Sequence, residues 1–149
     1  MNTLRMSKKT VFIEGAISPE FVANSIAKHQ GKTSIGAHNI FLGQVREDSV
    51  NDEMVTAIEF TTYQEMAEKK LAEIREETFE KYDLTCMHIY HSLGTVAVGG
   101  ICIFVFVSAP HRPIVYEATE YIVNQVKSHV PIFGKELFAT GAHQWKKNK

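Results

Sequence analysis

The chain has 149 residues, of which 44% are hydrophobic and 22% are charged. This balance excludes wholesale disorder and is typical of a single globular domain, here over residues 1–149 with flexible ends at 1–9 and 146–149. The formal net charge of −1 argues against a generally basic nucleic-acid binder and against a polybasic membrane binder. No apolar run is long enough for a signal sequence or a bilayer span, so we expect a soluble, cytoplasmic protein with no nucleic-acid or membrane partner.

The first half of the chain predicts strands around one helix. A short strand is expected over residues 10–14 and a helix over 18–31, because this segment starts with a Ser-Pro pair, which favours the N-cap and the first helical position. Loose alternation of apolar residues predicts a long strand over 34–45. A polar turn then leads to a strand over 55–62.

The second half carries the strongest periodicity. Apolar residues near the 3.6 spacing predict a helix over 63–82, followed by a strand over 84–90 and a separate extended piece over 94–100. The β-branched and aromatic run 101–108 predicts a buried central strand. A second amphipathic helix is expected over 113–129, and loops and short strands after it. The pattern as a whole implies an α+β fold with a mostly antiparallel or mixed sheet and two long amphipathic helices.

Charge is distributed unevenly along the chain. Residues 47–83 contain twelve acidic and four basic side chains, whereas residues 127–149 contain five lysines against Glu136 alone. The acidic surplus is expected on a solvated helix surface. The lysines, which lie beside Pro and Gly, could gather around an anion.

Cysteine and histidine give no sign of a metal site or a disulfide. Cys86 and Cys102 lie in apolar runs and suit buried thiols of a reducing compartment. Five other histidines are scattered singly, without metal-ligand spacing: His29, His38, His88, His91 and His143. We therefore expect neither a bound metal nor a cofactor.

Candidate functional residues are basic groups at the ends of predicted elements. Arg46 ends a strand, while His111 and Arg112 open a helix, where free N–H groups and the helix dipole favour an anion. Lys127 falls in the last turn of that helix, and Lys135 follows in a predicted loop. Each residue also has an ordinary interpretation as a solvated or helix-capping side chain.

The spacing of two of these residues sets a geometric condition. Arg112 and Lys127 are fifteen residues apart on one predicted helix, so about 22 Å separates them at 1.5 Å per residue. They cannot serve one small-molecule site within a single chain unless the helix breaks. If both belong to one site, a second copy must supply one of them, and function requires a homodimer.

Five motifs in order resemble the large subunit of molybdopterin synthase. They cover residues 41–46, 63–68, 91–94, 108–112, and Lys127 with 131–136, and are followed by Gly141 and Trp145. The resemblance implies an α/β-hammerhead fold and a dimer of large subunits, each joined by a small ubiquitin-like sulfur-carrier subunit. In that family the carrier's C-terminal Gly-Gly thiocarboxylate enters a pocket, and two sulfurs pass to cyclic pyranopterin monophosphate to form the molybdopterin dithiolene.

The resemblance also implies roles for individual residues. Lys127 would orient and polarise the thiocarboxylate or transfer a proton, with His111 as a proton shuttle or hydrogen-bond donor. Arg46 and Arg112 would hold the phosphate or pterin. The expected catalytic set is Lys127, Lys135 and His111. The expected substrate-binding set is Gln44, Val45, Arg46, His111, Arg112, Lys127, Gly134, Lys135 and Glu136.

Two positions depart from the family pattern. Gly134 stands where the family has a second lysine, and Ser92 stands where it has an arginine. Gly134 would make the predicted loop permissive, so Lys135 is expected to take over the missing role. The alternative is a paralogue that binds the carrier tail or the pterin without turnover.

Overall fold

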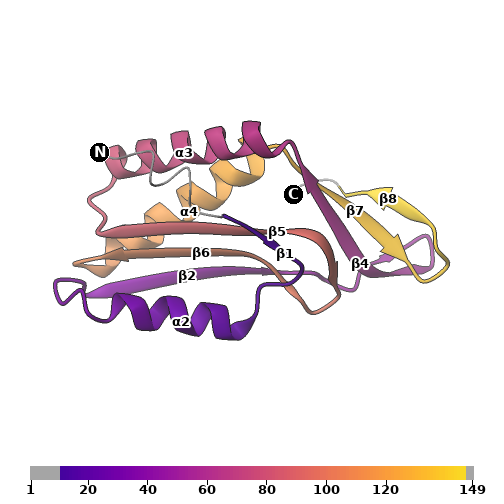
Figure 1. The fold of residues 1–149 in the computed structure, drawn as a ribbon, viewed down its shortest axis with the longest axis horizontal. Helices are drawn as coiled ribbons and strands as arrows, with labels where there is room; N and C mark the ends of the chain where they lie inside the picture. Colours follow the sequence, from indigo (N-terminus) through magenta and orange to yellow (C-terminus); the bar gives the residue numbers. More distant parts are fainter. Residues whose placement is uncertain (1–10, 147–149) are drawn as a thin grey trace.

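The computed structural model describes residues 11–146, which form an α+β fold of three helices and eight strands (Figure 1). The strands are β1 (Phe12–Glu14), β2 (Ala37–Gln44), β3 (Ser49–Val50), β4 (Glu53–Thr62), β5 (Cys86–Ala97), β6 (Ile101–Ala109), β7 (Ile132–Phe138) and β8 (His143–Trp145). The helices are α2 (Pro19–His29), α3 (Gln64–Lys81) and α4 (Arg112–His129). The expected α+β class is confirmed. None of these helices is long and apolar enough to cross a membrane.

β5 joins the two halves of the sheet. The strand order is β2-β6-β5-β4-β7-β8, with β1 beside β5 and β3 beside β4. Within residues 11–146 all pairings are antiparallel except that of β1 with β5. Residues 86–91 of β5 pair with β6, and residues 94–97 pair with β4. The sequence predicted two separate pieces here; instead one strand continues through Gly94, whose φ of 82° glycine adopts without strain.

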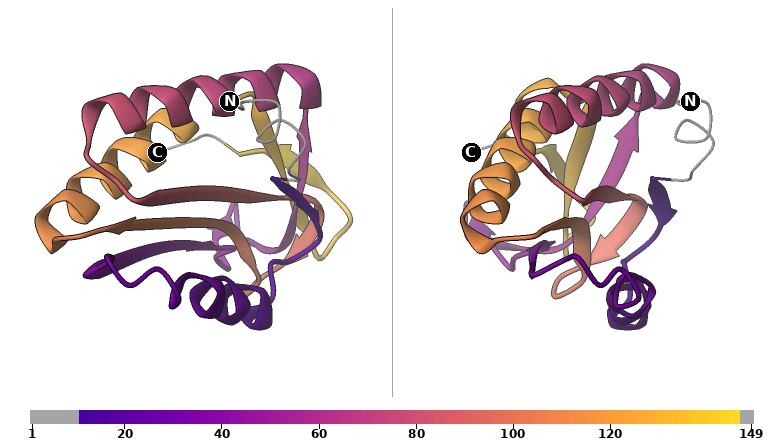
Figure 2. Two further views of the ribbon diagram at one scale, coloured as in Figure 1. Left: turned by 60° about the vertical axis from the view of Figure 1, so that its left-hand side comes forward. Right: turned by 90° about the vertical axis from the view of Figure 1, so that its left-hand side faces the viewer.

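Helices cover both faces of the β2-β6-β5 half (Figure 2). β6 is the buried central strand that its composition predicted, because its alternate residues serve two cores. Ile103, Val105 and Val107 pack under α3 and α4. Phe104 and Phe106 face α2 on the other side. Full burial of each such side chain contributes about 1.5–3 kcal/mol, so β6 holds the helices on both sides in fixed positions.

The end of the chain was predicted as loops and short strands, with Lys135 in a loop. The loop around Lys135 is instead part of strand β7 over residues 132–138, which pairs with β4 along its whole length. Lys146, expected in a flexible tail, donates its backbone N–H to the Gly134 carbonyl at 2.8 Å. The other predicted tail residues, 1–9 and 147–149, lie outside the described part of the chain. β7 lacks a strong strand signal of its own because Gly134 and Lys135 interrupt its apolar residues.

Candidate functional site

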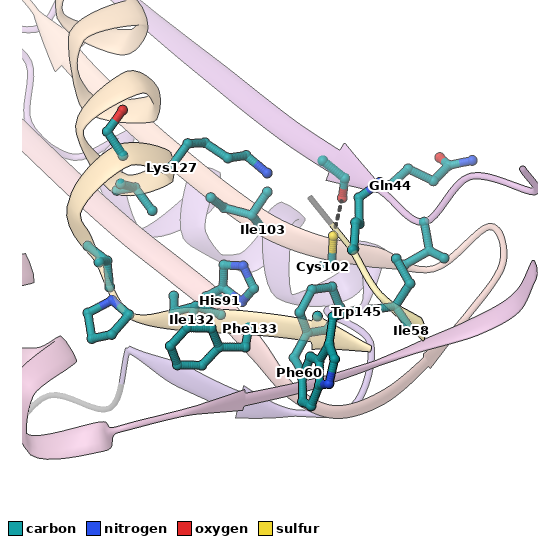
Figure 3. Close-up of a pocket in the computed structure, with 18 of the residues that line it drawn as sticks. Gln44, Ile58, Phe60, His91, Cys102, Ile103, Lys127, Ile132, Phe133 and Trp145 are labelled. Atoms are coloured by element: carbon teal, nitrogen blue, oxygen red, sulfur yellow. Dashed lines mark hydrogen bonds between the residues drawn. The ribbon is translucent and has the colours of Figure 1, made fainter. Parts of the chain in front are cut away.

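A cavity of about 630 Å³ opens where α4 ends (Figure 3). The C-terminal turn of α4, the end of β2, the start of β6 and the first half of β7 surround it. Its walls are partly apolar, and include Ile58, Phe60 and Ile103. A partly apolar wall strengthens any charge interaction inside the cavity, because the local dielectric is lower than that of water.

Three basic side chains line this cavity: Arg46, Lys127 and Lys146. Lys127 reaches into it from the last turn of α4 (Figure 3). Arg46 lies 72% exposed at the mouth, with its Nε 2.7 Å from the Asp48 carboxylate. Of the other predicted binding residues, Gln44, Val45 and Gly134 also line the cavity.

Cys102 lies among these charges. The thiol is only partly buried, not fully buried as the sequence suggested, and its Sγ is 3.5 Å from the Gly43 carbonyl oxygen. Burial raises the pKa of Cys102, while the charges of Lys127 and Lys146 oppose that rise. Both ammonium groups are therefore close enough to act on one point in the cavity.

His91 forms the floor beside Lys127 (Figure 3). Its Nδ1 lies 2.8 Å from the Ser92 carbonyl oxygen, which can only accept, so Nδ1 carries the hydrogen. The pKa of His91 is lowered to about 4, chiefly by burial, with the Ser92 hydrogen bond opposing the shift and the charge of Lys127 adding to it. The imidazole is therefore neutral near pH 7, so it adds a polar surface but no charge.

Lys146 occupies the sheet position opposite Gly134. Lys135 pairs with Trp145 in the β7–β8 register, so the next pair along the ladder is Gly134 with Lys146. Directly opposed residues point to the same face of a sheet. The Lys146 ammonium lies 4.0 Å from the buried Glu136 carboxylate, which is two positions from Gly134 on that face.

Gly134 itself is closely packed. A Cβ at this position would lie 3.1 Å from Ile58 Cγ2 and 3.4 Å from Phe60 Cε1. A side chain here would therefore have to displace the cavity wall. Because residue 134 is glycine, the space beside it on this face of β7 is left for the Lys146 side chain.

Lys135 lies outside the cavity. Neighbouring residues of a strand point to opposite faces, so Lys135 faces away from the side shared by Gly134 and Glu136. Its Nζ is 3.3 Å from the Glu59 carboxylate and 5.8 Å from the centre of the Trp145 ring. The expectation that loop freedom would let Lys135 reach the place of residue 134 fails because β7 is a paired strand.

His111 and Arg112 lie at the other end of α4. The helix runs unbroken from Arg112 to His129, with His111 as its N-cap. Fifteen residues of helix separate Arg112 from Lys127, which is about 22 Å. His111 and Arg112 are exposed and do not line the cavity. One chain therefore does not bring His111 and Arg112 to the site of Lys127, as the spacing in the sequence predicted.

Comparison with known proteins identifies the family. The family model described as MoaE protein matches residues 16–129. The chain belongs to the MoaE family. It is 34% identical over 122 residues to a molybdopterin synthase catalytic subunit of Aspergillus fumigatus, across 82% of this chain and 64% of that protein. The chain thus spans less than two thirds of that relative's length.

Two solved structures share the fold. Molybdopterin synthase from Staphylococcus aureus matches with a TM-score of 0.80 and 30% identity, over 95% of this chain and 98% of that one. A complex of subunits 1 and 2 of the molybdopterin-converting factor from Helicobacter pylori matches with a TM-score of 0.78, over 91% and 88%. Its 18% identity shows likeness of fold alone.

Among the cavity residues without a role predicted from the sequence are His91, Cys102 and Lys146. His91 lies in the family motif 91–94, but a single histidine in a strand gives no sign that it lines a cavity. Lys146 could not be found without the β7–β8 register, because its role depends on its position opposite Gly134.

We predict that His91 makes stability fall at mildly acidic pH. Its pKa is about 4 in the folded chain against 6.5 when unperturbed, so the unfolded state binds the proton first. The stabilisation is complete above pH 6.5 and is lost as the pH falls toward 4. Between about pH 7 and pH 5 the loss is about 2 kcal/mol.

Urea unfolding of the wild type and of His91→Asn at both pH values measures this loss. Asparagine retains an N–H donor near the place of Nδ1 but does not titrate, so the variant corrects for all other groups. Equal pH dependence of the two proteins would contradict the assignment.

Proposed function

We propose that this chain is a molybdopterin synthase catalytic subunit, a sulfurtransferase of molybdenum cofactor biosynthesis. It would transfer sulfur from the C-terminal thiocarboxylate of a small carrier subunit to cyclic pyranopterin monophosphate. One observation carries the proposal: Lys127 and Lys146 converge on a partly apolar cavity in a chain of the MoaE family. The relatives' names support the molybdopterin synthase part of this proposal.

The chemistry of the cavity suits two anionic reactants. A thiocarboxylate and a cyclic phosphate are both negatively charged and repel each other unless cations lie between them. Lys127, whose side chain reaches into the cavity from the last turn of α4, would polarise the thiocarboxylate or transfer a proton. Arg46, exposed at the mouth, is placed to hold the phosphate or pterin.

An exposed aromatic rim beside the cavity suits the carrier. Tyr63 and Phe133 contact each other edge to face at 5.6 Å, and Trp145 shares a shallow hollow with them. Tyr63, Met66 and Trp145 are each at least 58% exposed, which is unusual for large apolar side chains grouped together. We propose that the carrier docks on this rim and threads its C-terminus into the cavity. The Helicobacter pylori protein of this fold is likewise described as a two-subunit complex.

A homodimer would complete the site. Within residues 11–146, β2 pairs only with β6, which leaves its other edge available to a second copy. The Ala37 end of β2 pairs with Ala109, close to the start of α4, whereas its Gln44 end lies at the cavity. A two-fold axis through the middle of β2 would set these ends against each other. His111 and Arg112 of one copy would then approach the cavity of the other.

We further propose that Lys146 supplies the second lysine that this sequence lacks at Gly134. Its support is the shared face opposite Gly134 and its effect on Cys102. The alternative is a paralogue that binds without turnover, and Gly134 would favour it if no other residue replaced the lysine. Because Lys146 can replace that lysine, the active enzyme is the better-supported function.

We predict that Lys146→Ala lowers the rate of sulfur transfer by about 100-fold, as expected for the loss of one charge-stabilising donor. The matched control is Lys135→Ala, which removes an equal charge from the same pair of strands but on the opposite face. Because Lys135 lies against Trp145 of the proposed docking rim, both variants are compared at saturating carrier. Under that condition the rate of Lys135→Ala should stay near that of the wild type. Equal losses in both variants, or a loss in Lys135→Ala alone, would contradict the role of Lys146.

A single-turnover assay tests the proposed activity. The protein is mixed with a thiocarboxylated carrier and cyclic pyranopterin monophosphate, and the dithiolene product is measured for the wild type and for Lys127→Ala. We expect product from the wild type and a drop of about 10²–10⁴ in the variant. Carrier binding without product would favour the silent paralogue, and no carrier binding would refute the proposed activity.

A further inference from the structure

Three metal-ligating side chains meet at the other end of the sheet from the cavity. They are His29, the last residue of α2, and Cys86 and His88 at the start of β5. One ligand atom from each lies within 4.8 Å of the other two. His29 and Cys86 are buried, whereas His88 is partly exposed, so the cluster has a route to solvent.

The two imidazoles present their Nε2 atoms to each other. His29 Nδ1 is 2.7 Å from the Ser25 carbonyl oxygen, which can only accept, so Nδ1 carries the hydrogen and Nε2 carries a lone pair. That Nε2 atom lies 3.0 Å from Nε2 of His88. A backbone carbonyl that fixes the far nitrogen of a histidine is the usual outer partner of a metal-bound imidazole.

The thiol completes a three-ligand set of mixed N and S atoms. The Lys32 ammonium donates to Cys86 Sγ at 3.1 Å, so the sulfur already faces a cation. Lys32 is exposed on the turn after α2, so its side chain can move away when a cation arrives. Cys86 and His88 are two residues apart on one strand and therefore face the same side of the sheet.

We propose that His29, Cys86 and His88 bind one zinc ion that links the end of α2 to β5. Zinc takes N and S ligands in tetrahedral geometry at about 2.0–2.1 Å and 2.3 Å, which separates two nitrogen ligands by about 3.3–3.4 Å. The two Nε2 atoms need to part by only a few tenths of an ångström from their present 3.0 Å. Water would fill the fourth position, on the side of the partly exposed His88.

The site has a physical consequence for the fold. Without an ion, α2 packs on the sheet through apolar contacts. They join Phe21, Val22 and Ile26 to the face of β6 that carries Phe104 and Phe106. An ion at the last residue of α2 would add a second anchor at its C-terminal end. Because the ion binds the folded chain alone, its binding free energy would add to stability.

Cobalt(II) titration of the untagged protein tests this proposal, since Co²⁺ replaces Zn²⁺ in such sites and a cobalt–thiolate bond gives a charge-transfer absorption. We expect one equivalent to bind with that absorption and to be displaced by Zn²⁺. Cys86→Ser should abolish the absorption, and His88→Gln should weaken Zn²⁺ affinity at least tenfold. The matched control, Cys102→Ser, removes the other cysteine and should change neither.

Thermal unfolding with and without Zn²⁺ provides a second readout, with circular dichroism to confirm that each variant is folded. Zn²⁺ should raise the Tm of the wild type and of Cys102→Ser, but not that of Cys86→Ser. A cobalt complex without thiolate absorption, or an equal effect of the two cysteine substitutions, would overturn the proposal. So would weak binding of several ions without saturation.

Discussion

The unbroken length of α4 is the constraint on which the account of the site depends. Its buried stripe, formed by Val115, Ala118, Ile122 and Val126, packs against the sheet over the whole helix. The two prolines beside it lie at the first turn and just after the C-cap, where they do not break it. A rigid helix therefore holds Arg112 and Lys127 about 22 Å apart, and no side-chain movement within one chain can bring them to the same small molecule.

The chemistry of the cavity depends on the side chains that meet at the C-terminal end of α4. Lys127 comes from α4 and Lys146 directly follows β8, so both reach the cavity only because the sheet folds these segments together. Burial keeps His91 neutral, with its pKa lowered to about 4, and raises the pKa of the Cys102 thiol. The cavity lining holds Arg46, Lys127 and Lys146 and no Asp or Glu, although carboxylates outside the lining pair with Arg46 and Lys146. This excess of basic side chains in the lining suits anionic reactants.

Much of the fold could be predicted from the sequence because local signals agree with tertiary packing. The Ser18-Pro19 start of α2 and the apolar run of β6 are examples in which cap chemistry and composition decide the element. β7 could not be predicted, since Gly134 and Lys135 lower its strand propensity and pairing with β4 supplies the stabilisation. The position of Lys127 and Arg46 in their motifs is enough to predict them from the sequence. Lys146 could not be predicted, because its place depends on strand register. The His29–Cys86–His88 cluster could not be predicted either, because it joins residues up to 59 positions apart in the chain.

The central claim is that two copies of the chain form each site, and a heterodimer of two inactive variants tests it most directly. Lys127→Ala and Arg112→Ala are co-expressed with different tags, and the mixed dimer is purified and assayed for sulfur transfer. One of its two sites would combine an intact Lys127 from one copy with an intact Arg112 from the other, so activity should return to about half that of the wild type. Activity no higher than that of either variant alone would contradict a shared site.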